Sequence, residues 1–154
     1  MTTPIIEHIA ANIETTIDLI TTDNGWNQTL TSKRPTAVDY KNAAWDDLDV
    51  LISQVNGDED EGPLNVKTRN QHFDIMAIAL NSESSSVTID TRLNAIFADI
   101  EKKLMEDETR GTYAIDTTIH NPTFFKDNAG GLTGVNIDIS IQYRTVLTDP
   151  YTQG

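Results

Sequence analysis

The sequence predicts an α+β fold, in which one mainly antiparallel sheet is backed by two helices and ends in a long C-terminal β-hairpin. Residues 135–147 alternate strictly between apolar and polar side chains, which is typical of a strand with one buried and one solvated face. Two segments, near residues 5–20 and 89–105, repeat apolar residues at steps of three and four, which indicates amphipathic helices. Strands grouped around two helices indicate a layered domain, and the 154 residues suit a single one, 1–154.

The first half of the chain predicts a helix followed by three strands. The helix over residues 5–20 has Thr3 as its expected N-cap, just before Pro4. A short strand is expected at residues 26–30 and a loop at 36–47, because the latter is mixed and polar. The second expected strand covers residues 48–55, with alternate residues facing inward. The third covers residues 70–80. It has apolar residues at both odd and even positions, so we expect it to be central and covered on both faces.

The second half predicts a helix over residues 89–105, capped by Thr88, and then the C-terminal hairpin. Its strands are residues 112–119 and 135–147, joined by a connection that includes residues 120–131. The last strand spans about 43 Å at ~3.3 Å per residue. A globule of this size is about 39 Å across. We therefore expect part of this strand to reach a neighbouring subunit.

The balance of charge is strongly acidic, with 24 acids against 11 bases and a formal net charge of −13. This argues against binding of nucleic acid or an anionic membrane through a basic patch. The absence of cysteine excludes disulfides, thiolate metal sites and a cysteine nucleophile. The first residues do not have the pattern of a signal peptide, and no apolar run has the ~20 residues needed to span a bilayer.

Four adjacent acids, Asp58, Glu59, Asp60 and Glu61, stand between two glycines and predict a solvated turn. An EF-hand loop requires glycine at its sixth position and glutamate at its twelfth, and neither register of this segment provides both. The solvated turn is the favoured interpretation over a metal site. A third interpretation is a strip of negative charge that faces a lumen.

The three histidines, His8, His72 and His120, have no spacing typical of a metal site, so three unrelated structural histidines are expected. No G-x-S-x-G pattern presents a serine nucleophile. The sequence therefore predicts no catalytic, cofactor-binding or metal-binding residue, no cofactor and no enzymatic activity.

Two further sets of residues are candidate partner contacts. Phe124 and Phe125 are adjacent in the predicted connection, where they either pack under the sheet or anchor a partner. Asp138 and Arg144 share the polar face of the long strand. Exposed strand charges usually only solvate the strand or discourage edge-to-edge pairing, and this is the favoured interpretation. Pairing of the two across a subunit boundary in an oligomer is the alternative.

Several pieces, in their order along the chain, carry a resemblance to a known family. The first helix, I-I-E-H-I-A-A-N-I-E-T-T-I-D-L-I, leads into a G-W-N turn. The second helix reads T-R-L-N-A-I-F-A-D-I-E-K-K-L-M-E-D, and the long strand ends Q-Y-R-T-V-L-T-D-P-Y. In this layout the chain resembles the tail terminator (tail completion) proteins of long-tailed bacteriophages over most of its length.

The resemblance implies a small virion protein, assembled in the host cytoplasm, that forms a hexameric ring in the tail and neck. Such a ring caps the tail tube, ends its polymerisation and offers a docking face to head–tail connector or neck proteins, while DNA passes through without specific binding. The implied partners are further copies of the chain, the tail tube protein and the connector, with no membrane. The alternatives are another neck or connector protein, and a small hydrolase or ligand-binding domain.

Overall fold

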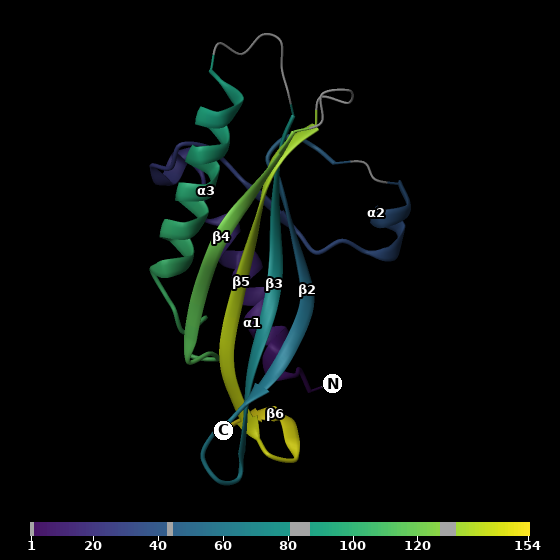
Figure 1. Ribbon diagram of the computed structural model, residues 1–154, viewed down its shortest axis with the longest axis vertical. Coiled ribbons are helices and arrows are strands. Elements are labelled where there is room, and N and C mark those ends of the chain that lie inside the picture. The colour runs from purple at the N-terminus through teal and green to yellow at the C-terminus, as the bar shows by residue number, and fades with distance from the viewer. Residues whose placement is uncertain (1, 43–44, 81–86, 127–131) are drawn as a thin grey trace.

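The structure is a computed structural model that describes residues 2–42, 45–80, 87–126 and 132–154 (Figure 1). In chain order its elements are α1 (Ile5–Asp18), the 3₁₀ turn η1 (Thr22–Asn24), β1 (Thr31–Lys33), α2 (Ala37–Asn42), β2 (Asp49–Asp60), β3 (Val66–Leu80), α3 (Ile89–Met105), β4 (Asp116–Lys126), β5 (Leu132–Val146) and β6 (Asp149–Gln153). The predicted α+β class is confirmed. None of the helices in these ranges has the length and apolar character needed to cross a bilayer.

The strands form one sheet in the order β1-β2-β3-β5-β4, with β6 paired to the end of β5. All pairings are antiparallel except that between β1 and β2. The two central strands, β3 and β5, are paired from Val66↔Val146 to Leu80↔Leu132 without a register shift. This continuous ladder supports the remaining strands and both long helices.

The hydrophobic core lies between this sheet and the helices α1 and α3, which pack on the same face of it (Figure 1). The buried residues of β5 alternate along the strand as predicted, and each of the two helices buries its predicted stripe of apolar residues. The buried apolar residues of these three elements include Val135, Ile137, Ile139 and Ile141 of β5, Ile9, Ile13 and Ile17 of α1, and Leu93, Ile96, Ile100 and Leu104 of α3. Burying each such side chain contributes about 1.5–3 kcal/mol, so this layer dominates the stabilisation.

The predicted bounds of α3 are correct, and its cap is the predicted one. Thr88 Oγ1 accepts a hydrogen bond from the Thr91 amide at 3.2 Å, which satisfies a donor of the first turn. The predicted cap of α1 is wrong. Pro4 occupies the N-cap position with no side-chain cap bond, which places the Thr3 hydroxyl one residue too early. The helix also ends at Asp18, two residues before the predicted end.

The segment predicted as a loop at 36–47 contains the short helix α2. Its start is fixed by a reciprocal capping box, in which Asp39 Oδ2 accepts from the Thr36 amide at 2.7 Å and Thr36 Oγ1 accepts from the Asp39 amide at 3.3 Å. The strand predicted at 26–30 is also displaced. Strand pairing begins only at Thr31, because Asn27 and Gln28 are hydrogen-bonded to Asp99 of α3, and the Leu30 amide donates to the Ile20 carbonyl oxygen.

The two strands that flank the central pair, β2 and β4, both differ from the prediction. β2 continues to Asp60, so the acids Asp58, Glu59 and Asp60 lie in a strand and not in a turn. β4 begins at Asp116 and runs to Lys126, which includes most of the expected 120–131 connection. Pro122 is tolerated there because β4 is at the edge of the sheet, where a missing N–H costs no pairing on the open side.

One buried cation fixes the end of α3. The Arg110 guanidinium is fully buried, and its Nη2 donates to the carbonyl oxygens of Leu104 and Asp107. A cation at a helix C-terminus complements the helix dipole and satisfies carbonyls that have no partner within the helix. Burial lowers the pKa of Arg110 from its ordinary value, against the opposing effect of Asp107. The buried Nε and Nη1 of this side chain have no hydrogen-bond partner in the described part of the protein.

Candidate functional site

The face of the sheet opposite α1 and α3 carries polar residues along the two central strands. The even-numbered residues of β3 and β5 point to this open face, including His72, Asp74, Asp138 and Ser140. Their side chains are half-buried, in contrast to the fully buried neighbours that face the helices. The prediction that residues 70–80 are covered on both faces is therefore wrong for this part of β3.

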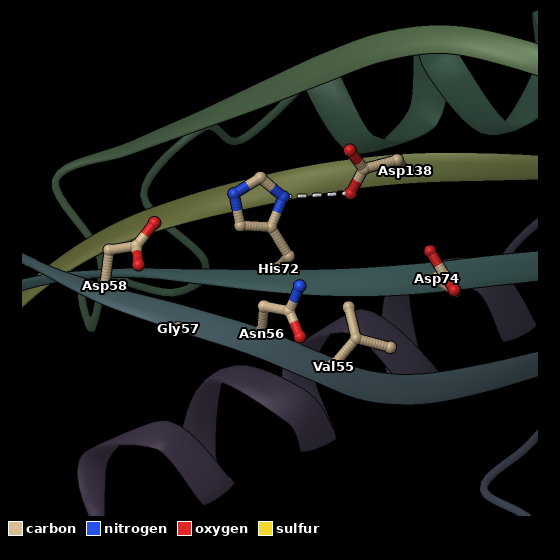
Figure 2. Close-up of a pocket in the computed structure, with 7 residues that line it drawn as sticks. All are labelled: Val55, Asn56, Gly57, Asp58, His72, Asp74 and Asp138. Atoms are coloured by element: carbon tan, nitrogen blue, oxygen red, sulfur yellow. Dashed lines mark hydrogen bonds and ion pairs between the residues drawn. The ribbon is translucent and has the colours of Figure 1, made fainter.

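A hydrogen-bonded cluster lies at the centre of the open face. His72 Nδ1 donates to Asp138 Oδ1 at 3.0 Å, which joins β3 to β5 (Figure 2). The His120 ring, on β4, stacks on the His72 ring with centroids 5.8 Å apart and an interplanar angle of 14°. His120 Nε2 lies 3.1 Å from Ser140 Oγ. Three adjacent strands thus contribute one residue each to a group formed by His72, His120 and Asp138.

Two β-bulges flank this group, one in each strand that borders the central pair. In β2 the register shifts between Gln54 and Gly57, so residues 55 and 56 stand opposite His72 alone. In β4 it shifts between Ile119 and Pro122, so residues 120 and 121 stand opposite Asp138 alone. Bulges concentrate beside functional sites because they redirect a side chain without disrupting the rest of the strand. Here the second bulge brings His120 beside Asp138.

The bulge in β2 is held open by a buried side chain. Gln71 Nε2 donates to the carbonyl oxygens of Val55 at 2.8 Å and Asn56 at 3.0 Å. Next to it lies an open hollow, lined by these two residues together with Asp58, His72, Asp74 and Asp138 (Figure 2). The hollow places the imidazole of His72 within reach of solvent and small solutes.

The hollow is acidic, and its charges are not all balanced. Asp74 stands directly opposite Asp138 in the β3–β5 register. Burial raises the pKa of Asp74 above its ordinary value, and the negative charge of Asp138 raises it further, while His72 acts in the opposite direction. Two carboxylates that face each other across a strand pair repel, and a cation placed between them would relieve that repulsion.

The predicted acidic strip divides between the two faces of the β2–β3 hairpin. Asp60 Oδ2 accepts from Asn70 Nδ2 and, at 3.1 Å, from Gln142 Nε2, both on the open face. Glu59 lies on the other face with Lys67 at 3.1 Å and Arg69 at 3.8 Å. Asp58 lines the hollow, and Glu61 is exposed just beyond the strand. The four acids thus form no single constellation.

The predicted partner contacts also separate. Phe124 is 42% exposed on β4, whereas the Phe125 ring packs over Gly134 of β5, where an added Cβ would lie 2.4 Å from the ring. Both lie in a paired strand and not in a loop. Arg144 Nε donates to Thr68 Oγ1 at 3.2 Å, so Arg144 and Asp138 each have a partner within the same chain.

Sequence spacing could not reveal the histidine cluster, because its members come from strands that are adjacent only in the folded sheet. The expectation of three unrelated histidines is wrong for two of them, His72 and His120. It holds for His8, which stacks on Tyr113 with ring centroids 4.5 Å apart. One ligand atom from each of His72, His120 and Asp138 lies within 4.8 Å of the other two, which makes this group the donor set most able to hold a metal among the described residues.

Comparison with known proteins adds no assignment to this geometry. Neither a scan against protein-family models nor a search of curated proteins finds a match to the chain.

Proposed function

We propose that this protein is a structural virion subunit, and not an enzyme, that forms a ring on the tail tube of a long-tailed bacteriophage. The ring ends tube polymerisation and provides the docking face for the head and neck. The layout resemblance to tail terminator proteins supports this proposal, and so does the order of the main elements, in which a long helix, strands and a second long helix are followed by a C-terminal hairpin.

The observation that carries the proposal is a sheet with two edges open to a neighbouring subunit. Among the strands that the structure describes, β1 pairs with β2 only from Thr31↔Asp49 to Lys33↔Leu51, so no strand covers β2 from Gln54 to Asp60. At the opposite side, the outer edge of β4 has no partner strand within the described ranges. Open edges are templates for pairing with another chain, and pairing unlike edges head to tail generates a closed ring when the rotation closes.

The shape of the molecule fits such an assembly. The β2–β3 hairpin extends past the helices at the lower end of the view in Figure 1, and residues 54–65 are exposed. This hairpin is an arm that can lie on a neighbour. The exposed acids Asp58 and Glu61 also suit a ring through which DNA passes, because negative charge repels phosphate.

The test is the native mass of the purified protein with negative-stain images of the same sample, followed by addition to polymerising tail tube protein of the same phage. A ring of about six copies that stops tube growth at its tip is the expected result. Rings that leave tube length unchanged but bind the head connector would instead identify the alternative neck protein. A monomer that neither binds tubes nor limits their length would overturn the proposal.

A further inference from the structure

The geometry points to a binding site for a divalent transition-metal ion, with Zn²⁺ as the reference ion, formed by His72, His120 and Asp138 on the open face of the sheet. Metal binding at these residues does not depend on the proposed ring. It assigns a ligand to residues for which the sequence predicted none.

The donor set is the first argument. Two imidazole nitrogens and one carboxylate oxygen are the three protein ligands of many zinc sites that leave a fourth position to water or another donor. The same set suits other divalent transition metals, whereas Mg²⁺ and Ca²⁺ prefer oxygen alone. A group of two histidines and an aspartate therefore selects a transition metal over the hard cations.

The distances are the second argument. His72 Nδ1 and Asp138 Oδ1 are 3.0 Å apart, close to the ~3.3 Å that separates two ligands bound tetrahedrally at ~2.0–2.1 Å. The metal would thus replace a hydrogen bond that already aligns two of its ligands. Since all three ligand atoms lie within 4.8 Å of one another, rotation of the exposed His120 side chain closes the site.

The surrounding structure is the third argument. The continuous β3–β5 ladder holds His72 and Asp138, and the β4 bulge places His120 beside them. Asp74 and Asp58 add negative charge around the hollow that leads to the site. Bound metal would offset the repulsion between Asp74 and Asp138 and would link β4 to the two central strands. The side chains of His72 and Asp138 remain 29% and 41% exposed, so an ion can enter from solvent.

The experiment is titration of tag-free protein with Zn²⁺ alone by calorimetry, with Mg²⁺ as a parallel probe and Co²⁺ absorption as a report on coordination. We expect one Zn²⁺ per chain, a raised melting temperature in its presence because the ion binds only the folded state, and no response to Mg²⁺. The visible absorption spectrum of Co²⁺ bound to the protein should indicate imidazole ligands and a low coordination number of the ion.

Variants locate the site. His120→Ala removes an exposed ligand and should weaken Zn²⁺ binding more than about tenfold, since even the loss of a residue that only orients a ligand costs 10–100-fold. His8→Gln is the matched control, because it removes the histidine that lies outside the cluster, and it should bind Zn²⁺ as the unmodified chain does. Asp138→Asn provides a second test should one variant unfold, and thermal unfolding without metal verifies each fold.

Two results would overturn the inference. One is the lack of saturable Zn²⁺ uptake at concentrations below about 1 mM, which is the range of weak, non-specific binding. The other is binding that survives in both His120→Ala and Asp138→Asn, or that is lost equally in His8→Gln, since either pattern would place the ion elsewhere.

Discussion

Asp74 of β3 and Asp138 of β5 stand directly opposite each other on the open face of the sheet, although like charges in this arrangement repel. Asp138 is hydrogen-bonded to His72. The pKa of Asp74 is raised, first by burial and then by the negative charge of Asp138. The fold therefore keeps an unfavourable carboxylate at this position, and this cost is the basis of a pH-dependent prediction.

Asp74→Asn should stabilise the protein at pH 7, by roughly 0.2–1 kcal/mol, the range for cross-strand pairs. Because the pKa of Asp74 is higher in the folded than in the unfolded state, the folded state binds the extra proton between the two values, and the penalty is complete above the folded pKa. As pH falls through the folded pKa toward the ordinary value near ~4, the penalty disappears, and so should the advantage of the variant.

Urea unfolding of the protein and of Asp74→Asn across this pH range measures that difference. Two groups face Asp74: Asp138 raises its pKa and His72 lowers it. When Asp74→Asn is made in the Asp138→Asn background, it should therefore stabilise the protein by a smaller amount. Asp116→Asn on β4 provides the control, because Asp116 is exposed and surface substitutions usually change stability by less than about 0.5 kcal/mol. An advantage that grows as pH falls would contradict the assignment.

Asp99 of α3 should be a strong structural determinant. It is 5% exposed, and its carboxylate accepts hydrogen bonds from the Asn27 amide at 3.2 Å, Asn27 Nδ2 at 2.9 Å and Gln28 Nε2 at 2.7 Å. Asp99→Ala leaves these donors without their acceptor and should lower the free energy of unfolding by about 1.5–3 kcal/mol. Glu101→Ala, an exposed acid on the same helix, should stay within about 0.5 kcal/mol. Equal effects in chemical denaturation would refute a specific role for Asp99.

Arg110, which follows the end of α3, should contribute more to stability than Arg92 near the start of that helix. Arg110→Ala removes a fully buried side chain and leaves the Leu104 carbonyl oxygen without this donor, so we expect a loss of about 2–4 kcal/mol. Arg92→Ala breaks a surface ion pair with Asp47 at 2.6 Å and should cost less than about 1 kcal/mol. Thermal unfolding separates the two, since 1 kcal/mol corresponds to about 2–4 °C for a domain of this size.

The elements that the sequence predicts well are those specified by local periodicity. The helix α3 and its Thr88 cap follow from a stripe and a capping residue, and β5 follows from strict alternation. The start of α2 is predictable from its capping residues, Thr36 followed by Asp39. The segment is nevertheless predicted as a loop because its composition is polar. The extent of β2 could not be predicted in this way, because its last residues are paired but exposed, so that no burial pattern distinguishes them from a turn.

The candidate site could not be predicted from the sequence at all. His72 and Asp138 are 66 positions apart, and their contact depends on the antiparallel register of β3 and β5. His120 joins them only because an extra residue in β4 shifts its register. Register and bulges are consequences of packing over the whole sheet, and a single residue of slip would move every side chain to the other face.

Phe124 and Phe125 should now have different roles. Phe125→Ser uncovers the packed Gly134 and should lower the free energy of unfolding by about 1–3 kcal/mol. The lower bound is below the ~1.5–3 kcal/mol for fully burying a large side chain, because Phe125 is only half-buried. Phe124→Ser alters a residue that is 42% exposed on the edge strand, so we expect stability within about 0.5 kcal/mol and weakened ring or tube association. Denaturation and tube-binding assays test each variant. Intact association in Phe124→Ser would remove it from the interface.

The acids at the tip of the β2–β3 hairpin provide the last prediction. Asp58 and Glu61 are exposed, whereas Glu59 and Asp60 have partners whose loss would disturb the hairpin itself. Replacing only Asp58 and Glu61 by Lys should therefore preserve the fold and ring assembly but impair DNA passage, because the new cations would hold phosphates that the native surface repels.

A matched variant carries the same change in charge on the helical side, at the exposed Glu101 and Glu108. Both double variants have the same net charge, so a defect confined to the hairpin variant would be due to position and not to overall charge. Infectivity and DNA ejection from assembled particles measure passage, and native mass verifies assembly. Normal DNA delivery by the hairpin variant would place this arm away from the channel, while failure to form rings would assign it to the contact between subunits.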